Sequence, residues 1–206
     1  MTVFDVLNSA IELEFTPTES WLCDLKAGES IIPAIKERLN GGKILFVAER
    51  KEFAGRLAKL ILLTGANINI SERFTSPAYN FNNDLSDAIM MPPRADFSDD
   101  GMHNYDNALL HEFGHWSGHP LRTNRPFYKK FMNNEKIGKA DRAEEEIVAE
   151  LIGAQLSFDL GATWSSGATA LYVSMHLKLT DKKLDELLPL VEEGRQFFRQ
   201  WYGELI

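Results

Sequence analysis

The amino-acid sequence predicts an α+β fold with a small sheet early in the chain and a helical C-terminal part. Two short segments, 66–70 and 88–91, have the apolar or alternating pattern of strands. After residue 103, apolar residues recur at helical spacing over 104–117, 142–160, 168–179 and 181–202. A chain with 44% hydrophobic residues, 11% of all residues being aromatic, buries a core and is not disordered.

The elements before residue 104 are delimited by turn residues. A helical pattern begins at Phe53 and ends at Gly65, and the strand over 66–70 follows it. The asparagine-rich stretch 71–86 is expected to be a loop. Two prolines follow the strand over 88–91, and because proline cannot donate to a ladder we expect this strand at the edge of the sheet.

The remaining segments set the domain organisation. Residues 1–52 are weakly patterned, with a helix expected over 31–39 and a strand over 44–48. We therefore divide the chain into a short N-terminal extension of unclear role, 1–52, and a main domain, 53–206. Between the first two C-terminal helices, residues 121–141 are rich in Arg, Lys and Asn and predict a solvated loop.

Composition excludes several classes of protein. The single cysteine, Cys23, excludes an internal disulfide framework and a zinc site with several cysteines. A net charge of −8 argues against nucleic-acid binding through a general basic surface. The chain starts without a basic n-region and has no apolar run of about 18–20 residues. We expect a cytoplasmic protein with no membrane partner.

The segment with the clearest chemistry is His-Glu-Phe-Gly-His, residues 111–115. On a helix, positions i and i+4 lie on one face, so His111 and His115 can present two imidazole nitrogens to one metal ion. Glu112 follows the first histidine and can take a proton from a water that the metal activates. This is the arrangement of a metal hydrolase, with one Zn²⁺ per chain as the default ion.

A catalytic zinc site needs a third protein ligand, and the sequence offers several. Glu146 is our first choice, because it lies on the helix over 142–160 and Glu150, on the same face, can hydrogen-bond the far nitrogen of a ligand histidine. This resembles the glutamate-zincin pattern Glu-x-x-x-Asp, with Glu in place of Asp. Glu145 and Glu150 are alternative ligands, and so is His119, which follows a glycine as in metzincins.

Two further features concern the substrate. Tyr172 is a possible stabiliser of an oxyanion. The strand over 88–91 can lie beside the metal helix, where an extended substrate can pair with it.

Several longer stretches resemble one family. HEFGHWSGHPLRTNR, EEIVAE, the segment from Ile89 to Arg94 and the segment from Tyr172 to Leu177 occur in the same order in the C-terminal metallopeptidase domain of ArdC-type antirestriction proteins. Related domains occur in polyvalent proteins of plasmids and phages. The resemblance runs from about residue 53 to 206.

The resemblance implies a zincin-like fold, a bound zinc held by His111 and His115, Glu112 as the catalytic base and an acidic third ligand. It also implies a bacterial cytoplasmic setting and a role in defeating host restriction. Full-length members carry an N-terminal domain that binds single-stranded DNA. Here about 50 residues without a basic stripe precede the metallopeptidase part, so nucleic-acid binding is not expected of this chain alone.

Two functions follow. The first is a zinc metalloendopeptidase of a mobile genetic element that acts on a protein or peptide substrate. The alternative is a non-proteolytic zincin scaffold that inhibits a host defence protein by binding it, for which the net charge of −8 suits mimicry of DNA phosphates.

Overall fold

The computed structural model describes residues 30–33, 36, 53–81, 87–97, 104–162, 164, 166–201 and 203. Most of the N-terminal extension lies outside the described residues, including the strand expected over 44–48 and most of the helix expected over 31–39. Within the described part, Ile31 is fully buried and its backbone N–H donates to Oε1 of Gln155 at 2.9 Å. Ile31 therefore shares the core of the main domain.

The sheet of the described residues has the strand order β1-β3-β2. Strand β1 (Asn67–Ile70) runs parallel to β3 (Ala88–Met91), and β2 (Ala78–Asn80) runs antiparallel to β3. The sequence-based expectation that 88–91 forms the edge is therefore wrong, because β3 is the central strand. The expected loop over 71–86 also contains a strand, β2, and that strand is an edge.

Both differences have a physical cause. Ala88, Ile89 and Met91 are buried, which suits a strand with neighbours on both sides. The two prolines come after the last paired residue of β3 and so remove no hydrogen bond from its ladders. Strand β2 has only three residues, Ala-Tyr-Asn, and is too short to show a period in the sequence.

The helices agree with the predicted segments to within a few residues. Gly65 ends the first helix in the left-handed region, at φ 65°, and Asn104 caps another by accepting from the N–H of Asp106. The helices are α3 (Phe53–Thr64), α4 (Tyr105–Ser117), α5 (Pro126–Met132), α6 (Lys139–Leu160), α7 (Ser166–Leu177) and α8 (Leu184–Arg199). Helix α5 lies in the stretch that was expected to be a loop.

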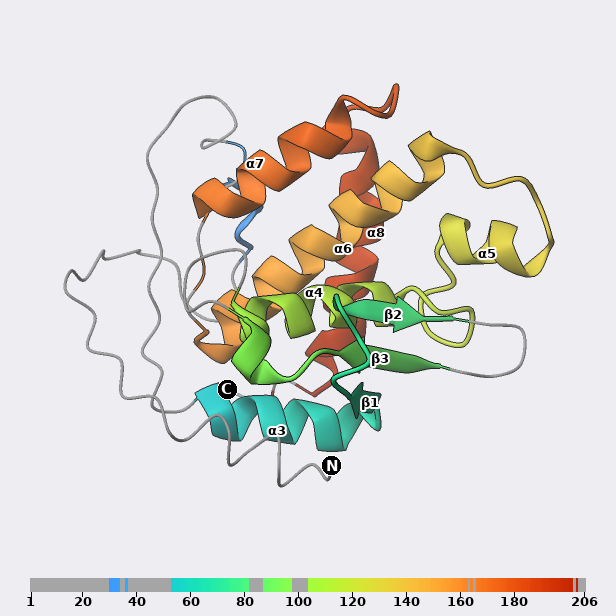
Figure 1. Cartoon of the computed structure of the whole chain (residues 1–206). Helices are drawn as coiled ribbons and strands as arrows, with labels where there is room; N and C mark the ends of the chain where they lie inside the picture. The colour runs from blue at the N-terminus through green and yellow to red at the C-terminus, as the bar shows by residue number, and fades with distance from the viewer. Residues whose placement is uncertain are drawn as a thin grey trace.

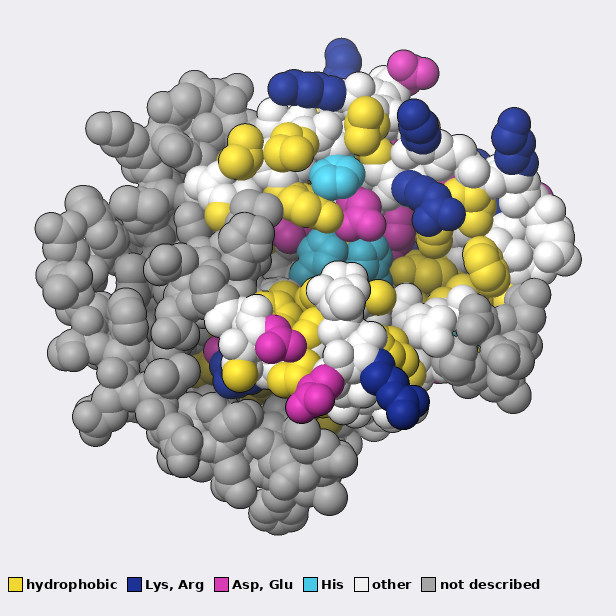
Figure 2. Space-filling model, in the orientation of Figure 1, with side chains coloured by type: hydrophobic (Ala, Val, Ile, Leu, Met, Phe, Trp, Pro, Cys, Tyr) yellow, Lys and Arg dark blue, Asp and Glu magenta, His cyan; other side chains and the backbone are white. Residues whose placement is uncertain are grey.

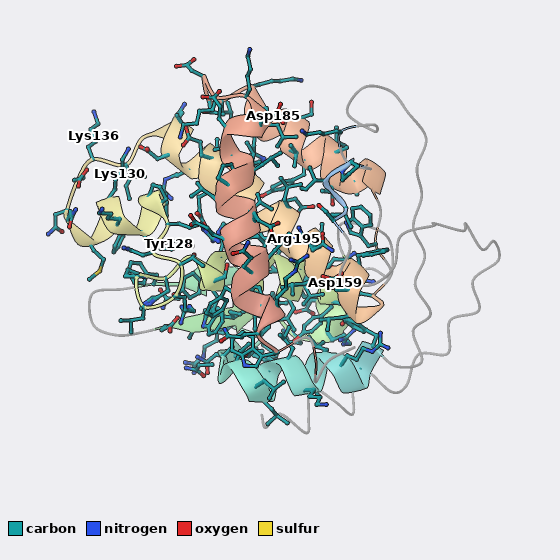
Figure 3. All side chains as sticks on the ribbon, turned by 180° about the vertical axis from the view of Figure 1, so that it is seen from behind. Tyr128, Lys130, Lys136, Asp159, Asp185 and Arg195 are labelled. Carbon is teal, nitrogen blue, oxygen red and sulfur yellow. The ribbon has the colours of Figure 1, made fainter. Side chains whose placement is uncertain are left out.

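Helix α6 runs through the middle of the molecule (Figure 1). Helix α7 lies on one side of it, α4 and the strands lie on the other, and α5 lies beside the end of β2. Seen from behind, α8 crosses the back of α6 (Figure 3). The arrangement confirms the α+β class, and it puts both faces of α4 in contact with other elements.

Helices α4 and α6 approach each other unusually closely at two glycines. A Cβ added to Gly114 would lie 2.2 Å from the backbone oxygen of Ala149. A Cβ added to Gly153 would lie 2.8 Å from the backbone of His111. Any larger residue would force the helices apart, so these glycines set the distance between the side chains that the two helices present to each other.

None of the described helices combines the length and the apolar character that crossing a bilayer requires.

Replacing Gly114 by Ala tests this packing. We expect Gly114→Ala to lower the free energy of unfolding by about 1–3 kcal/mol, because the added methyl group overlaps the α6 backbone. Gly55→Ala is the matched control, since a Cβ at Gly55 in α3 meets nothing within 4 Å and alanine favours a helix. Denaturant titration measures both, and equal stabilities of Gly114→Ala and the parent would contradict the packing argument.

Candidate metal centre

Two histidines of α4 face one glutamate of α6. Nε2 of His111 lies 3.3 Å from Oε2 of Glu146, and Nε2 of His115 lies 3.4 Å from the same oxygen. One ligand atom from each of the three residues lies within 4.8 Å of the other two. The motif spacing and the close helix crossing thus bring His111, His115 and Glu146 together.

The donor set fits a divalent cation. Metal–ligand distances of about 2.0–2.1 Å in a tetrahedral site place neighbouring ligand atoms about 3.3–3.4 Å apart. The two distances from Glu146 have these values. Two imidazoles and one carboxylate leave a fourth position for a water or a substrate, as in catalytic zinc sites.

The other nitrogen of each histidine is held by a carboxylate of α6. Nδ1 of His111 lies 2.9 Å from Oε2 of Glu150, and Nδ1 of His115 lies 3.0 Å from Oε1 of Glu145. In a metal site, such a carboxylate fixes Nδ1 as the protonated nitrogen and turns Nε2 toward the ion. The structure thus places Glu150 where the sequence analysis put it, and Glu145 makes the equivalent contact rather than facing the centre.

Glu145 is in turn held by a fully buried arginine. The Arg125 guanidinium makes two hydrogen bonds to the Glu145 carboxylate, and its side chain is 0% exposed. It also donates to the backbone oxygens of Gly114 and His115 and to Oγ of Ser117. Arg125 thus caps the last turn of α4 and fixes Glu145 in the same set of contacts.

Glu150 has its own support from α7. Oγ1 of Thr169 donates to Oε1 of Glu150 at 2.7 Å, and Nε1 of Trp164 donates to Oγ1 of Thr169 at 2.9 Å. Both Trp164 and Thr169 are buried. The chain from Trp164 to His111 therefore ties α7 to the face of α4 that carries the histidines.

The carboxylates set the charge of the two histidines. Burial lowers the pKa of His111, but hydrogen bonds to Glu146 and Glu150 outweigh burial and hold that pKa well above its ordinary value. Burial also opposes protonation of His115, while hydrogen bonds to Glu145 and Glu146 raise its pKa to about 9. The same contacts outweigh the effect of burial on Glu146 and hold its pKa well below the usual range.

The three candidate ligands open into a cleft of about 500 Å³. Figure 2 shows histidine and acidic side chains gathered at the centre of this face, in a hollow below α7. Glu112 lines the cleft and is only 6% exposed. A carboxylate next to the first histidine and open to the cleft has the position that a general base requires.

Strand β2 forms another wall of the cleft through Ala78, Tyr79 and Asn80. Arg122 fixes this wall: its guanidinium makes two hydrogen bonds to Asp87, another to the hydroxyl of Tyr79, and one to the backbone oxygen of Trp116 in α4. The guanidinium carbon also lies 3.8 Å from the centroid of the Trp116 ring. The edge strand therefore has a fixed position relative to the histidine helix.

Two remaining candidates have clear positions. Tyr172 lines the cleft and donates to Oε2 of Glu146 at 2.7 Å. His119 is outside the ligand group: its Nδ1 accepts from the N–H of Leu121 at 3.0 Å, and its ring packs edge-on against Phe81. The turn after α4 carries the His119 ring away from the centre, so His119 does not complete the group.

Sequence reasoning missed the residues that support the centre. Arg122 and Arg125 lie in the stretch that was expected to be a solvated loop, yet both make ion pairs inside the molecule. Thr169 and Gly114 also gave no signal as single residues. For Arg125 the sequence does carry one signal. It follows the histidine helix closely, and basic side chains can cap the carbonyl end of a helix.

A substitution at Glu150 tests the supporting carboxylates. Glu150→Gln keeps the shape of the side chain but removes the charge that makes His111 a stronger ligand. We expect the affinity for Zn²⁺ or Mn²⁺ to fall by about 10–100-fold in a chelator competition assay. Glu144→Gln is the matched control, because Glu144 contacts Thr180 and Lys182 instead of the centre. Equal affinities in both variants would refute the role of Glu150.

Proton release tests the charge state of the metal-free centre. Hydrogen bonds to carboxylates raise the pKa of both histidines, and a metal ion binds neutral imidazole, so binding should displace their protons. We expect release of about two protons per ion, measured by calorimetry in buffers of different ionisation enthalpy. Affinity should rise with pH through about 9, the pKa of His115. Binding enthalpies that do not depend on the buffer would contradict this charge state.

Comparisons with known proteins show the family to which the chain belongs. The family model described as zincin-like metallopeptidase, MPTase-PolyVal, matches residues 56–188. Two Escherichia coli proteins named DNA primase TraC are 31% identical over 134 residues and 33% identical over 101 residues. These matches cover 63% and 48% of this chain but only 12% and 6% of the relatives, so the chain corresponds to a small part of their length.

A solved structure shows the same fold. The Mn(II)-bound crystal structure of the antirestriction protein ArdC from plasmid R388 matches with a TM-score of 0.52 and 24% sequence identity. The match covers 79% of this chain and 54% of the ArdC chain. These findings confirm the ArdC-type resemblance and the zincin-like α+β fold. Since the family model spans more than half of the sequence, the chain belongs to the zincin-like metallopeptidase family.

Proposed function

We propose that this chain is a zinc-dependent endopeptidase with His111, His115 and Glu146 as metal ligands and Glu112 as the general base. The observation that carries the proposal is the convergence of both Nε2 atoms on one oxygen of Glu146, at 3.3 and 3.4 Å. Glu112 lines the cleft that these ligands face. Family membership, which implies a divalent metal, supports the same conclusion.

Each residue has a defined task in this proposal. A divalent ion at this position would polarise the substrate carbonyl and lower the pKa of a water. Glu112 takes the proton of the attacking water on its carboxylate and passes it to the leaving amine nitrogen. Glu145 and Glu150 keep the protons of the histidines on Nδ1, which leaves both Nε2 atoms free to act as ligands.

The walls of the cleft suit an extended peptide. Strand β2 is an edge of the described sheet and lines the cleft, so a peptide running along Ala78 and Tyr79 can add to the sheet by main-chain hydrogen bonds. Tyr172 stands on the other side, with its hydroxyl 2.7 Å from Glu146. We assign Tyr172 to the developing oxyanion, since a phenol at the ligand group can donate to it.

Zinc is the ion that the donor set favours, because two imidazoles and one carboxylate in a tetrahedral spacing are typical zinc ligands. The ArdC structure is Mn(II)-bound, so manganese is the second ion to test. Elemental analysis of the purified protein, with one ion per chain expected, distinguishes the two.

The biological setting comes from the relatives. ArdC is titled an antirestriction protein of a plasmid, and the E. coli relatives are named DNA primase TraC. We propose that this chain acts for a mobile genetic element and cleaves a host protein, with a restriction or other defence protein as the first class to test. A net charge of −8 makes nucleic acid an unfavourable partner for this chain by itself.

A second function shares the same scaffold. The fully buried Arg125–Glu145 pair and the close α4–α6 crossing stabilise the centre whether or not it is catalytic. A zincin scaffold that inhibits a defence protein by binding alone therefore fits the same structure. Metal removal would unfold such a protein, while its inhibitory activity would not depend on Glu112.

Glu112→Gln separates the two functions. Glutamine keeps the size of the side chain but cannot accept the proton, so we expect peptide hydrolysis to fall by about 10²–10⁴-fold while metal content stays at the parent value. Glu144→Gln serves as the control for the same charge change, because Glu144 contacts Thr180 and Lys182 and does not line the cleft. Hydrolysis and antirestriction activity are both measured; a Glu112→Gln protein that protects DNA fully in cells would instead establish the binding scaffold.

A further inference from the structure

One wall of the cleft is aromatic. Phe81, Phe127, Tyr128 and Phe131 line it, and we call these four residues the aromatic wall. The Phe81 ring centroid lies 5.4 Å from that of Tyr128 and 5.2 Å from that of Phe131, and the Phe127 and Tyr128 rings lie 5.2 Å apart. The wall is thus a continuous set of rings contributed by α5 and by the residue that follows β2.

The aromatic wall is exposed to the cleft rather than closed over. Tyr128 is buried, at 3% exposure, and forms the base of the wall. Phe81, Phe127 and Phe131 are only partly buried, and all three line the cleft. Flat rings that keep exposed area in a cleft gain free energy when another apolar or aromatic side chain covers them.

A single permanent positive charge stands beside this wall. Among the described residues that line the cleft, Arg142 is the one Lys or Arg. It precedes Glu146 by one helical turn, so it lies on the same face of α6 as the ligand. Its guanidinium carbon is 6.0 Å from the centroid of the Phe127 ring, and its side chain is exposed.

The basic residues near Arg142 in sequence do not line the cleft. Lys130 makes an ion pair with Asp141, and Lys136 extends away from the body of the molecule (Figure 3). Lys139 is exposed at the start of α6 and does not line the cleft. Arg142 therefore directs its charge into the cleft, where the aromatic wall lies next to it.

We propose that the cleft selects an extended peptide that carries an aromatic side chain against the aromatic wall and, two residues away on the same face of the peptide, an acidic side chain that pairs with Arg142. The inference rests on the proposed function, because it names the substrate class of the same site. The aromatic residue supplies burial and shape, and the acidic residue supplies an ion pair that also disfavours a basic residue. A cleft volume of about 500 Å³ accommodates both side chains.

A peptide library measures both preferences. Internally quenched peptides, varied one position at a time, are incubated with the full chain loaded with Zn²⁺. At one position we expect Phe to exceed Ala by about tenfold or more in kcat/KM, since apolar pockets discriminate on this scale. At the position two residues away, on the same face of the extended peptide, we expect Asp to exceed Lys, with a ratio that falls as salt is added.

Two variants connect the preferences to the residues. Arg142→Glu should reverse the preference for Asp over Lys, and Phe131→Leu should reduce the preference for Phe at least threefold. The matched controls are Lys139→Glu, which makes the same charge change outside the cleft, and Phe197→Leu, which removes a partly buried ring in α8. Both controls should keep the preferences of the parent. Equal rates for Phe and Ala, or an Asp-to-Lys ratio that Arg142→Glu leaves unchanged, would overturn the inference.

A binding measurement separates this inference from the proposed function. The same peptides, labelled with a fluorophore, are titrated with the Zn²⁺-loaded Glu112→Gln protein, and their affinities are read by anisotropy. If the parent hydrolyses no peptide, the endopeptidase proposal fails. A tenfold tighter binding of the peptide with Phe and Asp two residues apart than of its counterpart with Ala and Lys would still support the selective cleft. If hydrolysis occurs but all peptides bind equally, the endopeptidase proposal stands and the selective cleft is refuted.

Discussion

The metal-ligand group depends on how closely α4 and α6 cross. Gly114 and Gly153 lie at the crossing, where a Cβ would meet backbone atoms of the other helix at 2.2 and 2.8 Å. A glutamate side chain is short, so Glu146 reaches the histidines only because the helix backbones come this near. Larger residues at the two glycines would push the two helix backbones apart. The spacing of the motif provides the histidines, and the crossing provides their partner.

The orientation of α6 assigns different tasks to neighbouring acids. Successive residues of a helix point about 100° apart, so Glu144, Glu145 and Glu146 face different surroundings. Glu144 pairs with Lys182, Glu145 with the buried Arg125, and Glu146 faces both histidines. A carboxylate as buried as Glu145 is costly without a counter-charge, and Arg125 supplies it together with hydrogen bonds. Arg125 also binds the carbonyl end of α4, so one side chain connects the helix end to the histidine orientation.

Helical periodicity in the sequence predicts part of the candidate metal centre. The pairing of His111 with His115 follows from helical spacing alone, and Glu146 with Glu150 follows from the same rule on another helix. The position of a strand within a sheet follows from contacts distant in sequence, which is why β3 was expected at an edge and β2 was missed. For Arg125 the sequence shows a charge but not its burial, because burial depends on where Glu145 lies. The residues of the ligand group can thus be predicted from spacing within each helix. The residues that hold them in place depend on contacts between segments distant in sequence.

The net charge of −8 is not only a property of the surface, because some of the carboxylates contact the histidines of the candidate metal centre. Several of these carboxylates face the two histidine imidazoles and raise their pKa values. The folded-state pKa of His115, about 9, lies above its ordinary value of 6.5, so its charge contributes stability that is complete below pH 6.5 and is lost as the pH rises through about 9. Above that range Glu145 and Glu146 lose a positive neighbour, and a divalent ion replaces the charge that the protons supplied. Protons and a divalent ion would therefore compete for the same imidazoles, and either one places positive charge beside the carboxylates of α6.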